Sequence, residues 1–241
     1  LDELGIADDT IVMYSTDNGV HMNSWPDAGM TPFRNEKNSM WEGAYRVPCV
    51  VRWPGQIPAG EVRNGIVSHL DWFTTLHAAA GVDDIADQLK AGAMLNGGEY
   101  KVHLDGENML PYWKGETDNS PRTQFVYFSD TGDLCAVRWN HWKFVFLEQR
   151  AQGTLQVWRE PYTELRIPLI FNLKTDPYER AQITSNTYED WFIDHAYMMG
   201  PAQAFVARLA ESLKEFPRRQ EPASFTIDKV LAKMQEGVGS S

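Results

Sequence analysis

The sequence is poor in cysteine and in basic residues, and it has no long hydrophobic run. Its 241 residues include 2 cysteines, and 22 lysines and arginines stand against 33 aspartates and glutamates, for a net charge of −11. Nucleic-acid binding needs a basic face, so this balance argues against a nucleic-acid partner. An acidic protein can still hold an anionic substrate with a few local cations. No stretch predicts a transmembrane segment or a signal peptide.

Neither cysteine belongs to a CxxC pair or to a Cys/His cluster, which argues against a zinc site. Cys49 and Cys135 each lie in an apolar, strand-like run, so we expect both to be buried free thiols. Repeats and low-complexity tracts are also missing. With 43% hydrophobic and 12% aromatic residues, the chain can bury a sizeable core, in one large domain or two small ones.

The first half of the chain has the pattern of a layered α/β sheet. Residues 10–16 (TIVMYST) and 47–55 (VPCVVRWPG) predict strands, the first of them buried on both faces of a parallel sheet. Asp71 is a good N-cap, Gly81 is a good stop, and the apolar spacing between them predicts a helix. Residues 82–120 look irregular, with one extended piece at EYKVHLDG.

The pattern changes near residue 120, where we place a boundary between residues 1–120 and residues 121–241. The runs QFVYFSD, DLCAVRWN and HWKFVFLEQ are joined by tight turns and predict an antiparallel meander, and PLIFNL adds a further strand. Residues 188–216 predict a helix that Gly200-Pro201 splits or kinks. The run FTIDKVLAKMQEG predicts a short final helix.

The residues that could carry chemistry follow the first predicted strand. Asp17 and Asn18 are hard oxygen donors that suit Mg²⁺ or Ca²⁺, although Asp-Asn-Gly is also a common turn. Arg34 and Lys37 lie in a long loop after them and could hold a tetrahedral oxyanion, or could simply be solvated charges. His21 could contact the substrate or carry a proton, or could be a surface histidine.

The run from Thr10 to Gly60 combines a strand, Asp-Asn-Gly, a long loop with a lysine, Trp-Glu-Gly, Arg-Val-Pro and Trp-Pro-Gly. In this order, these elements resemble type I sulfatases, the arylsulfatase-like members of the alkaline phosphatase superfamily. The runs SHLDWFTTLHAAAG, HLDGENMLPYWKG and FNLKTDPYERAQI extend the resemblance over nearly the whole chain. It implies part of a mixed, mostly parallel sheet with flanking helices. A small α+β subdomain with an antiparallel sheet and a long C-terminal helix would follow.

The resemblance implies a sulfuric ester hydrolase, in which Asp17 and Asn18 are calcium or magnesium ligands and Lys37 is the catalytic, sulfate-binding lysine. His21 and Arg34 lie in the same loop and are candidate substrate ligands without a motif match. Residues 41–43 look like scaffold beneath the lysine. By the same resemblance, a periplasmic or secreted location is plausible.

The family's nucleophile is a formylglycine made in a Cys/Ser-x-Pro-x-Arg motif, and this chain has no such motif. The chain also begins without Met, in mid-unit. We therefore expect a fragment whose missing N-terminal part carries the formylglycine, the first metal-binding aspartates and any export signal. Such a fragment should be inactive alone and should self-associate through its truncated sheet.

Three other interpretations stay open. The first is a phosphonate or phosphodiester hydrolase of the same superfamily, which would share the sheet and the metal edge. The second is a non-catalytic carbohydrate-binding or scaffold protein with an aromatic-rich surface. The third, a partial open reading frame, is compatible with the sulfatase interpretation.

Overall fold

A computed structural model describes residues 1–24, 27, 29–218, 231–232 and 235. The chain forms two compact units. The strand-pair unit comprises residues 1–15 and 49–123, and the meander unit comprises residues 16–48 and 124–241. The boundary predicted near residue 120 stays a prediction. Residues 16–48, which include every predicted site residue, pack with the second half of the chain and not with the strands on either side of them.

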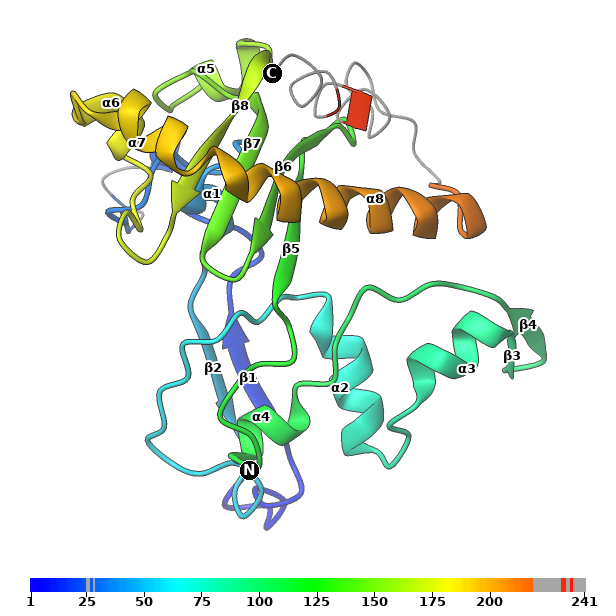
Figure 1. Cartoon of the computed structure of the whole chain (residues 1–241). Coiled ribbons are helices and arrows are strands. Elements are labelled where there is room, and N and C mark those ends of the chain that lie inside the picture. Colours follow the sequence, from blue (N-terminus) through cyan, green and yellow to red (C-terminus); the bar gives the residue numbers. More distant parts are fainter. Residues whose placement is uncertain (25–26, 28, 219–230, 233–234, 236–241) are drawn as a thin grey trace. The chain divides into compact units, whose positions relative to one another are not determined.

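The strand-pair unit contains β1 (Val12–Ser15) and β2 (Cys49–Arg52), which pair antiparallel with Ser15 opposite Cys49 (Figure 1). The mixed α/β class is confirmed, but the parallel arrangement expected of β1 is not found between these strands. The described part of the segment that joins them contains no long crossover helix of the kind that links parallel neighbours, and mixed sheets commonly include antiparallel pairs.

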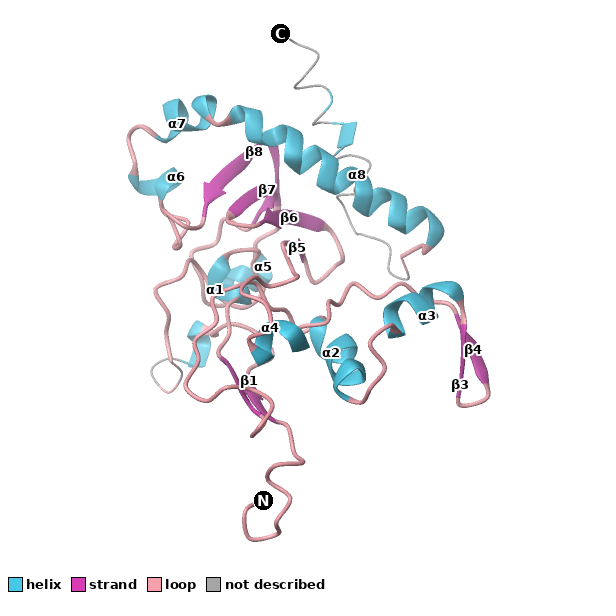
Figure 2. Cartoon of the chain, turned by 60° about the horizontal axis from the view of Figure 1, so that its bottom comes forward, coloured by secondary structure: helices cyan, strands magenta, loops and turns pink. Residues whose placement is uncertain are grey.

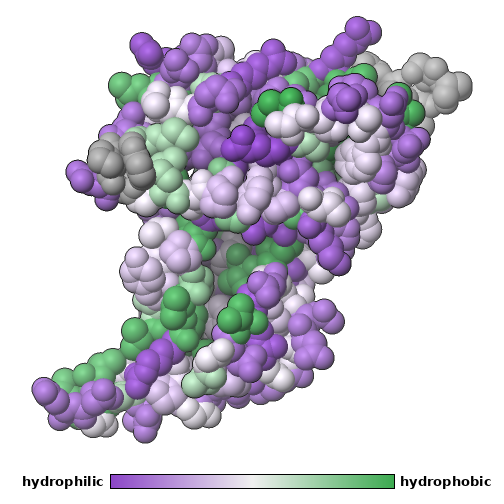
Figure 3. All heavy atoms as spheres, turned by 90° about the vertical axis from the view of Figure 1, so that its left-hand side faces the viewer, coloured by the Kyte–Doolittle hydropathy of each residue, from purple (hydrophilic) through white to green (hydrophobic). Residues whose placement is uncertain are grey.

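The burial expected for this strand pair is also wrong for the described residues. Tyr14 is 63% exposed and Val50 62% exposed, because a two-stranded ribbon has two open edges and little to cover its faces. Figure 3 shows hydrophobic side chains gathered on the surface of the part of the molecule that carries these strands. Both cysteines are free thiols, as predicted, and Cys135 is buried as expected, but the burial expected of Cys49 is wrong, because this residue is exposed on the strand pair. The expected self-association through this face stays a prediction.

The rest of the strand-pair unit is more regular than the sequence indicates. Helix α2 (Asp71–Ala79) ends before Gly81, which takes a left-handed φ of 90°. Three further elements occupy the stretch predicted to be irregular: α3 (Ile85–Ala91), a hairpin of β3 (Ala93–Leu95) and β4 (Gly98–Tyr100), and α4 (Leu110–Lys114). Figure 2 shows the hairpin beside α3.

Asp71 is the first residue of α2 and not its N-cap, which is Leu70. Its carboxylate instead accepts hydrogen bonds from the backbone N–H groups of Ser68 (2.7 Å) and Glu107 (2.8 Å). It also forms an ion pair with Arg122, whose Nε lies 2.9 Å from Oδ2 and 3.0 Å from Oδ1. This buried carboxylate therefore joins the helix start to two distant loops of the same unit.

The meander unit has the predicted antiparallel sheet, in the order β5-β6-β7-β8. Its strands are β5 (Gln124–Phe128), β6 (Leu134–Trp139), β7 (Trp142–Glu148) and β8 (Thr163–Asn172). Residues 16–48 contribute a 3-10 turn (Met22–Ser24) and α1 (Glu42–Tyr45), and α5 (Gln156–Arg159) lies between β7 and β8. The sheet supplies most of the buried hydrophobic core of this unit.

The predicted C-terminal helix is divided, but not where the sequence indicates. After α6 (Ala181–Thr184), α7 (Tyr188–Asp194) is followed by a 3-10 turn (Ala196–Met198) and then by α8 (Met199–Glu215). The break falls at His195. Pro201 lies in the first turn of α8, where its missing N–H has no helical acceptor to lose. Figures 1 and 2 show α8 lying across the sheet, and its Ala202, Phe205 and Val206 are buried in the core. The short helix predicted for FTIDKVLAKMQEG falls largely outside the described residues.

Candidate functional site

Asp17 and Asn18 lie directly after β1, as the sequence predicts. Asp17 is exposed, and no hydrogen bond or ion pair joins its carboxylate to another described residue. The Asn18 amide N–H donates to the Gly19 carbonyl at 2.7 Å, which leaves the amide oxygen free to act as an acceptor or ligand. Two unengaged oxygen donors therefore lie side by side in the chain.

The loop that follows folds back onto these two residues. The Lys37 N–H donates to the Val20 carbonyl at 2.9 Å, and the Gly19 N–H donates to the Ala44 carbonyl at 2.7 Å. A Cβ at Gly19 would lie 1.9 Å from the Gly43 carbonyl oxygen, so only glycine allows this approach. The backbone carrying Lys37 is thus held against the turn that carries Asn18.

The loop of residues 34–43, here called the lysine loop, is fastened to the rest of the meander unit by its side chains. The amides of Asn35 and Asn38 donate to the carbonyls of Ala151 (2.6 Å) and Val157 (3.0 Å). Buried Glu36 accepts hydrogen bonds from the backbone N–H groups of Met22 and Thr154, and the Trp41 indole donates to the Gln149 carbonyl at 3.0 Å. These bonds hold the loop against the connection between β7 and β8.

Lys37 contrasts with its neighbours in this loop. Lys37 is half-buried, and no hydrogen bond or ion pair joins its ammonium to another described residue. Asn38 on one side and Glu36 on the other are both engaged. An unpaired cation on a rigid loop is the arrangement expected of a group that binds an external anion.

The Arg34 guanidinium is bound by other groups of the protein. It lies 3.3 Å from the centre of the Trp41 ring, and it donates to the Glu179 carbonyl (3.2 Å) and the Gln182 side chain (3.2 Å). It also forms an ion pair with Glu148 at 3.4 Å. Burial lowers the pKa of this guanidinium below its usual value, against the opposing effect of Glu148 and Glu179. Arg34 thus lies at the start of the lysine loop, but its guanidinium is bound by protein groups.

His21 is also engaged by protein groups. The Trp158 indole N–H donates to His21 Nε2 at 3.3 Å, and the Asn23 amide lies 3.1 Å from the same nitrogen. Because an indole nitrogen can only donate, Nε2 acts as the acceptor and the ring proton belongs on Nδ1.

The sequence did not predict the buried charge cluster beneath the lysine loop. Lys143 on β7 is fully buried, with its ammonium 2.6 Å from a Glu179 oxygen and 3.2 Å from a Glu42 oxygen. The Glu42 carboxylate also accepts hydrogen bonds from the Tyr127 hydroxyl (2.7 Å) and from Arg46 Nε (2.7 Å). A signal was available in the sequence, because Lys143 directly precedes the apolar residues FVFL of a predicted strand. A lysine is almost never fully buried unless it is paired, so a lysine in such a strand calls for an acidic partner.

The two carboxylates of this cluster differ in acidity. Burial alone would raise the pKa of Glu42, but the charges of Lys143, Arg138 and Arg46 outweigh it and hold the pKa at about 2. For Glu179, burial dominates over the attraction of Lys143 and raises the pKa to about 6.

This difference predicts a specific acid sensitivity. The pKa of Glu42 lies below its usual 4.5, so its contribution to stability is complete above pH 4.5 and is lost as the pH falls towards 2. The free energy of unfolding should therefore drop by about 3 kcal/mol in this window. Glu179 acts oppositely between about pH 6 and 4.5, where its protonation favours the fold, so the Glu42 effect is measured below 4.5.

Urea titrations at successive pH values would measure this effect, with Glu42→Gln and the exposed Glu189→Gln compared in parallel. In Glu42→Gln, the free energy of unfolding should no longer fall by this amount below pH 4.5. In Glu189→Gln, it should fall as it does in the wild type. If the free energy of unfolding of Glu42→Gln fell with pH as steeply as that of the wild type, Glu42 would not be the cause of the acid sensitivity.

The donor set at Asp17 and Asn18 fits a hard divalent cation in part. A carboxylate and an amide oxygen are suitable for Ca²⁺ or Mg²⁺, but Ca²⁺ takes about 6–8 oxygen ligands. Among the described residues, no group of three or more His, Cys, Asp or Glu could hold a metal ion. These two residues could thus supply part of a metal shell and would need further ligands.

Two family models match this chain: "Sulfatase" over residues 1–82, and "C-terminal region of aryl-sulfatase" over residues 120–237. Steryl-sulfatase of Mus musculus is 30% identical over 205 residues, covering 76% of this chain and 30% of that protein. N-acetylgalactosamine-6-sulfatase of Rattus norvegicus is 32% identical over 204 residues, covering 79% and 37%. The chain therefore spans about a third of the length of these relatives.

Among solved structures, the PsFucS1 sulfatase from Pseudoalteromonas sp. superimposes with a TM-score of 0.71 at 27% identity, over 90% of this chain and 40% of that one. None of the described helices is long and apolar enough to cross a membrane. The matched ranges include both the lysine loop and the meander with its long helix. The chain belongs to the sulfatase family.

Proposed function

We propose that this chain contributes half of the active site of a sulfuric ester hydrolase. The observation that carries the proposal is half-buried Lys37, whose ammonium is not paired with any described residue and whose backbone N–H is bonded to Val20 in the turn after Asn18. Family membership supports the same reaction, since the relatives are named as sulfatases. We keep a periplasmic or secreted location as part of this proposal.

In the proposed reaction, Asp17 and Asn18 help to hold a calcium or magnesium ion. When bound, this ion would polarise the sulfate oxygens and favour an ionised nucleophile. Lys37 donates to sulfate oxygens as negative charge builds on them, and the anchored backbone of its loop reduces the reorganisation needed at the moment of reaction. His21 lies three residues after Asn18 and is a candidate contact to the organic part of the substrate.

We do not include Arg34 among the proposed substrate ligands. Its guanidinium is committed to Glu148, Gln182 and the Glu179 carbonyl, and it lies against the Trp41 ring. Its proposed role is to anchor the start of the lysine loop to Glu148, Glu179 and Gln182. A tetrahedral phosphonate or phosphodiester would fit the same three site residues, and no contact in the structure favours it over a sulfate ester.

The chain by itself should not hydrolyse sulfate esters. It contains no Cys/Ser-x-Pro-x-Arg motif from which a formylglycine could be made, and its two metal donors form only part of a shell. A chromogenic aryl sulfate, incubated with the purified chain and Ca²⁺ or Mg²⁺, should give no product above the buffer control. The matched positive control is the whole protein to which this chain belongs, which should turn over the same ester.

Turnover by the chain alone would show that the nucleophile lies within these 241 residues. It would overturn the proposal that this chain contributes only half of the active site. A whole protein that cleaves a phosphodiester faster than any sulfate ester would favour the phosphodiesterase alternative instead.

A further inference from the structure

The contacts beneath the lysine loop converge on two buried residues, Lys143 and Glu179. The Lys143 ammonium donates to the Met40 carbonyl at 2.8 Å, in addition to its ion pairs with Glu42 and Glu179. It also lies 4.1 Å from the centre of the Tyr127 ring. The ammonium thus donates hydrogen bonds to two acceptors of the lysine loop, Met40 and Glu42, and its contact with Glu179 is an ion pair.

Glu179 holds both ends of the same loop. Its carboxylate accepts the Glu42 N–H at 2.7 Å, and its carbonyl accepts the Arg34 guanidinium at 3.2 Å. Between these two contacts the loop closes on itself, because the Gly43 N–H donates to the Arg34 carbonyl at 2.8 Å. One residue therefore fixes the width of the loop that presents Lys37.

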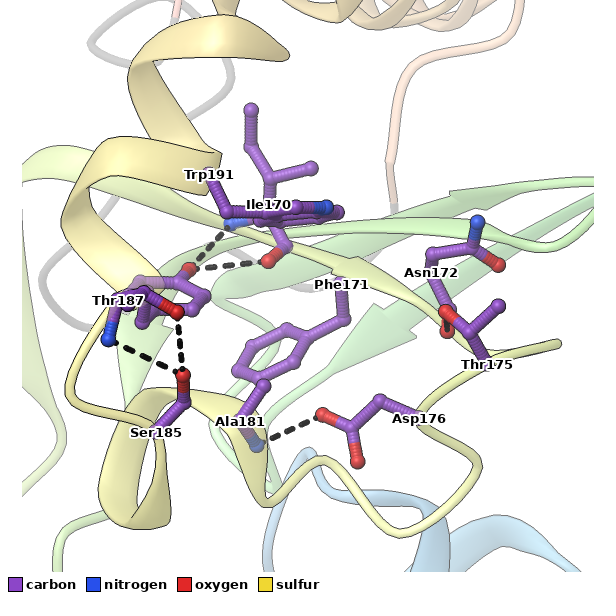
Figure 4. A pocket seen from close by; sticks show the side chains of 10 residues that line it. Ile170, Phe171, Asn172, Thr175, Asp176, Ala181, Ser185, Thr187 and Trp191 are labelled. Atoms are coloured by element: carbon purple, nitrogen blue, oxygen red, sulfur yellow. Dashed lines mark hydrogen bonds between the residues drawn. The ribbon is translucent and has the colours of Figure 1, made fainter.

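Glu179 reaches this position through an unusual backbone. Its φ is 53°, in the left-handed region that non-glycine residues seldom adopt. The turn is secured by Asp176, whose carboxylate accepts the N–H groups of Arg180 and Ala181, each at 2.9 Å. Figure 4 shows the Asp176 to Ala181 bond at the edge of a cavity of about 220 Å³. Strain of this kind persists only where surrounding contacts enforce it.

We propose that Lys143 and Glu179 form an ionic clamp that positions Lys37 for catalysis. Neither residue is required to touch the substrate. They act by binding Met40, Glu42 and Arg34, three residues of the lysine loop, and so hold the loop in place. The inference rests on the function proposed above. The clamp joins Glu42 of the Trp-Glu-Gly run to Glu179 of the Asp-Pro-Tyr-Glu run, 137 residues later in the chain.

The clamp predicts a catalytic effect that a purely structural pair would not have. In the whole protein, Lys143→Met should lower kcat/KM for a sulfate ester by about 100-fold, as expected when a catalytic group shifts by about 1 Å. Glu179→Gln, which keeps the side-chain size, should lower it by roughly 10-fold on the same reasoning. The double variant should lose no more than Lys143→Met alone, since both residues act through one loop.

Amide hydrogen exchange would be measured on the same variants. Exchange at residues 34–43 should accelerate by roughly 10-fold or more, while β5–β7 amides stay protected. The matched control is Lys174→Met, an exposed lysine after β8, which should match wild type in both measurements. Glu179→Gln carries the test if Lys143→Met does not fold.

The outcomes separate the clamp from the proposed function. Folded variants with kcat/KM within twofold of Lys174→Met and an unchanged exchange rate in the lysine loop would overturn the clamp. Accelerated exchange in a protein whose wild type cleaves no sulfate ester would support the clamp as a loop anchor and overturn the proposed function and the catalytic role together.

Discussion

Replacing Lys37 with alanine in the whole protein should lower kcat for a sulfate ester by about 100- to 1,000-fold, the usual effect of removing one preorganised donor from a transition state. The free energy of unfolding should change by no more than about 0.5 kcal/mol, because no described residue bonds to the ammonium. Steady-state kinetics and chemical denaturation, measured on the same preparation, would show both effects.

The combination of a large kinetic effect and a small stability effect is diagnostic of Lys37. Lys90→Ala is a suitable control, because Lys90 is an exposed lysine on α3 and lies in the other unit. Lys37→Arg should retain part of the activity, since the charge remains while the geometry of the donors changes. If Lys37→Ala turned over the sulfate ester at the wild-type rate, Lys37 would not be part of the catalytic site.

The largest expected effect on stability lies in the strand-pair unit. Asp71→Ala should lower the free energy of unfolding by about 3–5 kcal/mol, because it leaves the Arg122 guanidinium buried without its carboxylate. The side chains of Asp71 and Arg122 are only 1% and 8% exposed, and Asp71 also accepts the N–H groups of Ser68 and Glu107. Urea denaturation followed by circular dichroism would measure the loss.

The exposed Asp87→Ala on α3 is the control and should change stability by less than about 0.5 kcal/mol. In the double variant Asp71→Ala/Arg122→Met, part of the stability should return, since the uncompensated charge is gone. A loss of less than 1 kcal/mol in Asp71→Ala would show that this ion pair does not hold the two loops.

The strands of the meander could be predicted because their pattern is local. The apolar runs at β5, β6 and β7 are separated by short turns, and neighbouring strands in such a pattern pair with each other. The break at His195 could not be predicted in the same way. Pro201 is the strongest local helix breaker in that stretch, yet in the first turn of α8 it costs no hydrogen bond.

The candidate site shows the same limit. The positions of Asp17, Asn18 and Lys37 relative to the first strand follow from an ordered run of motifs. The burial of Lys143 depends on Glu179, which lies 36 residues away in the sequence and reaches it through a left-handed turn. Likewise, Asp71 has the residue type of an N-cap, but its partner Arg122 lies 51 residues later. Pairings at such distances are set by tertiary packing, which local patterns do not encode.

The three proposed site residues can be tested together in a crystal structure of the whole protein grown with calcium and soaked with inorganic sulfate. We predict a cation coordinated by the side-chain oxygens of Asp17 and Asn18, with a sulfate oxygen within hydrogen-bond distance of the Lys37 ammonium. A cation bound elsewhere, with Lys37 directed away from the anion, would contradict the claim that these three residues belong to one site.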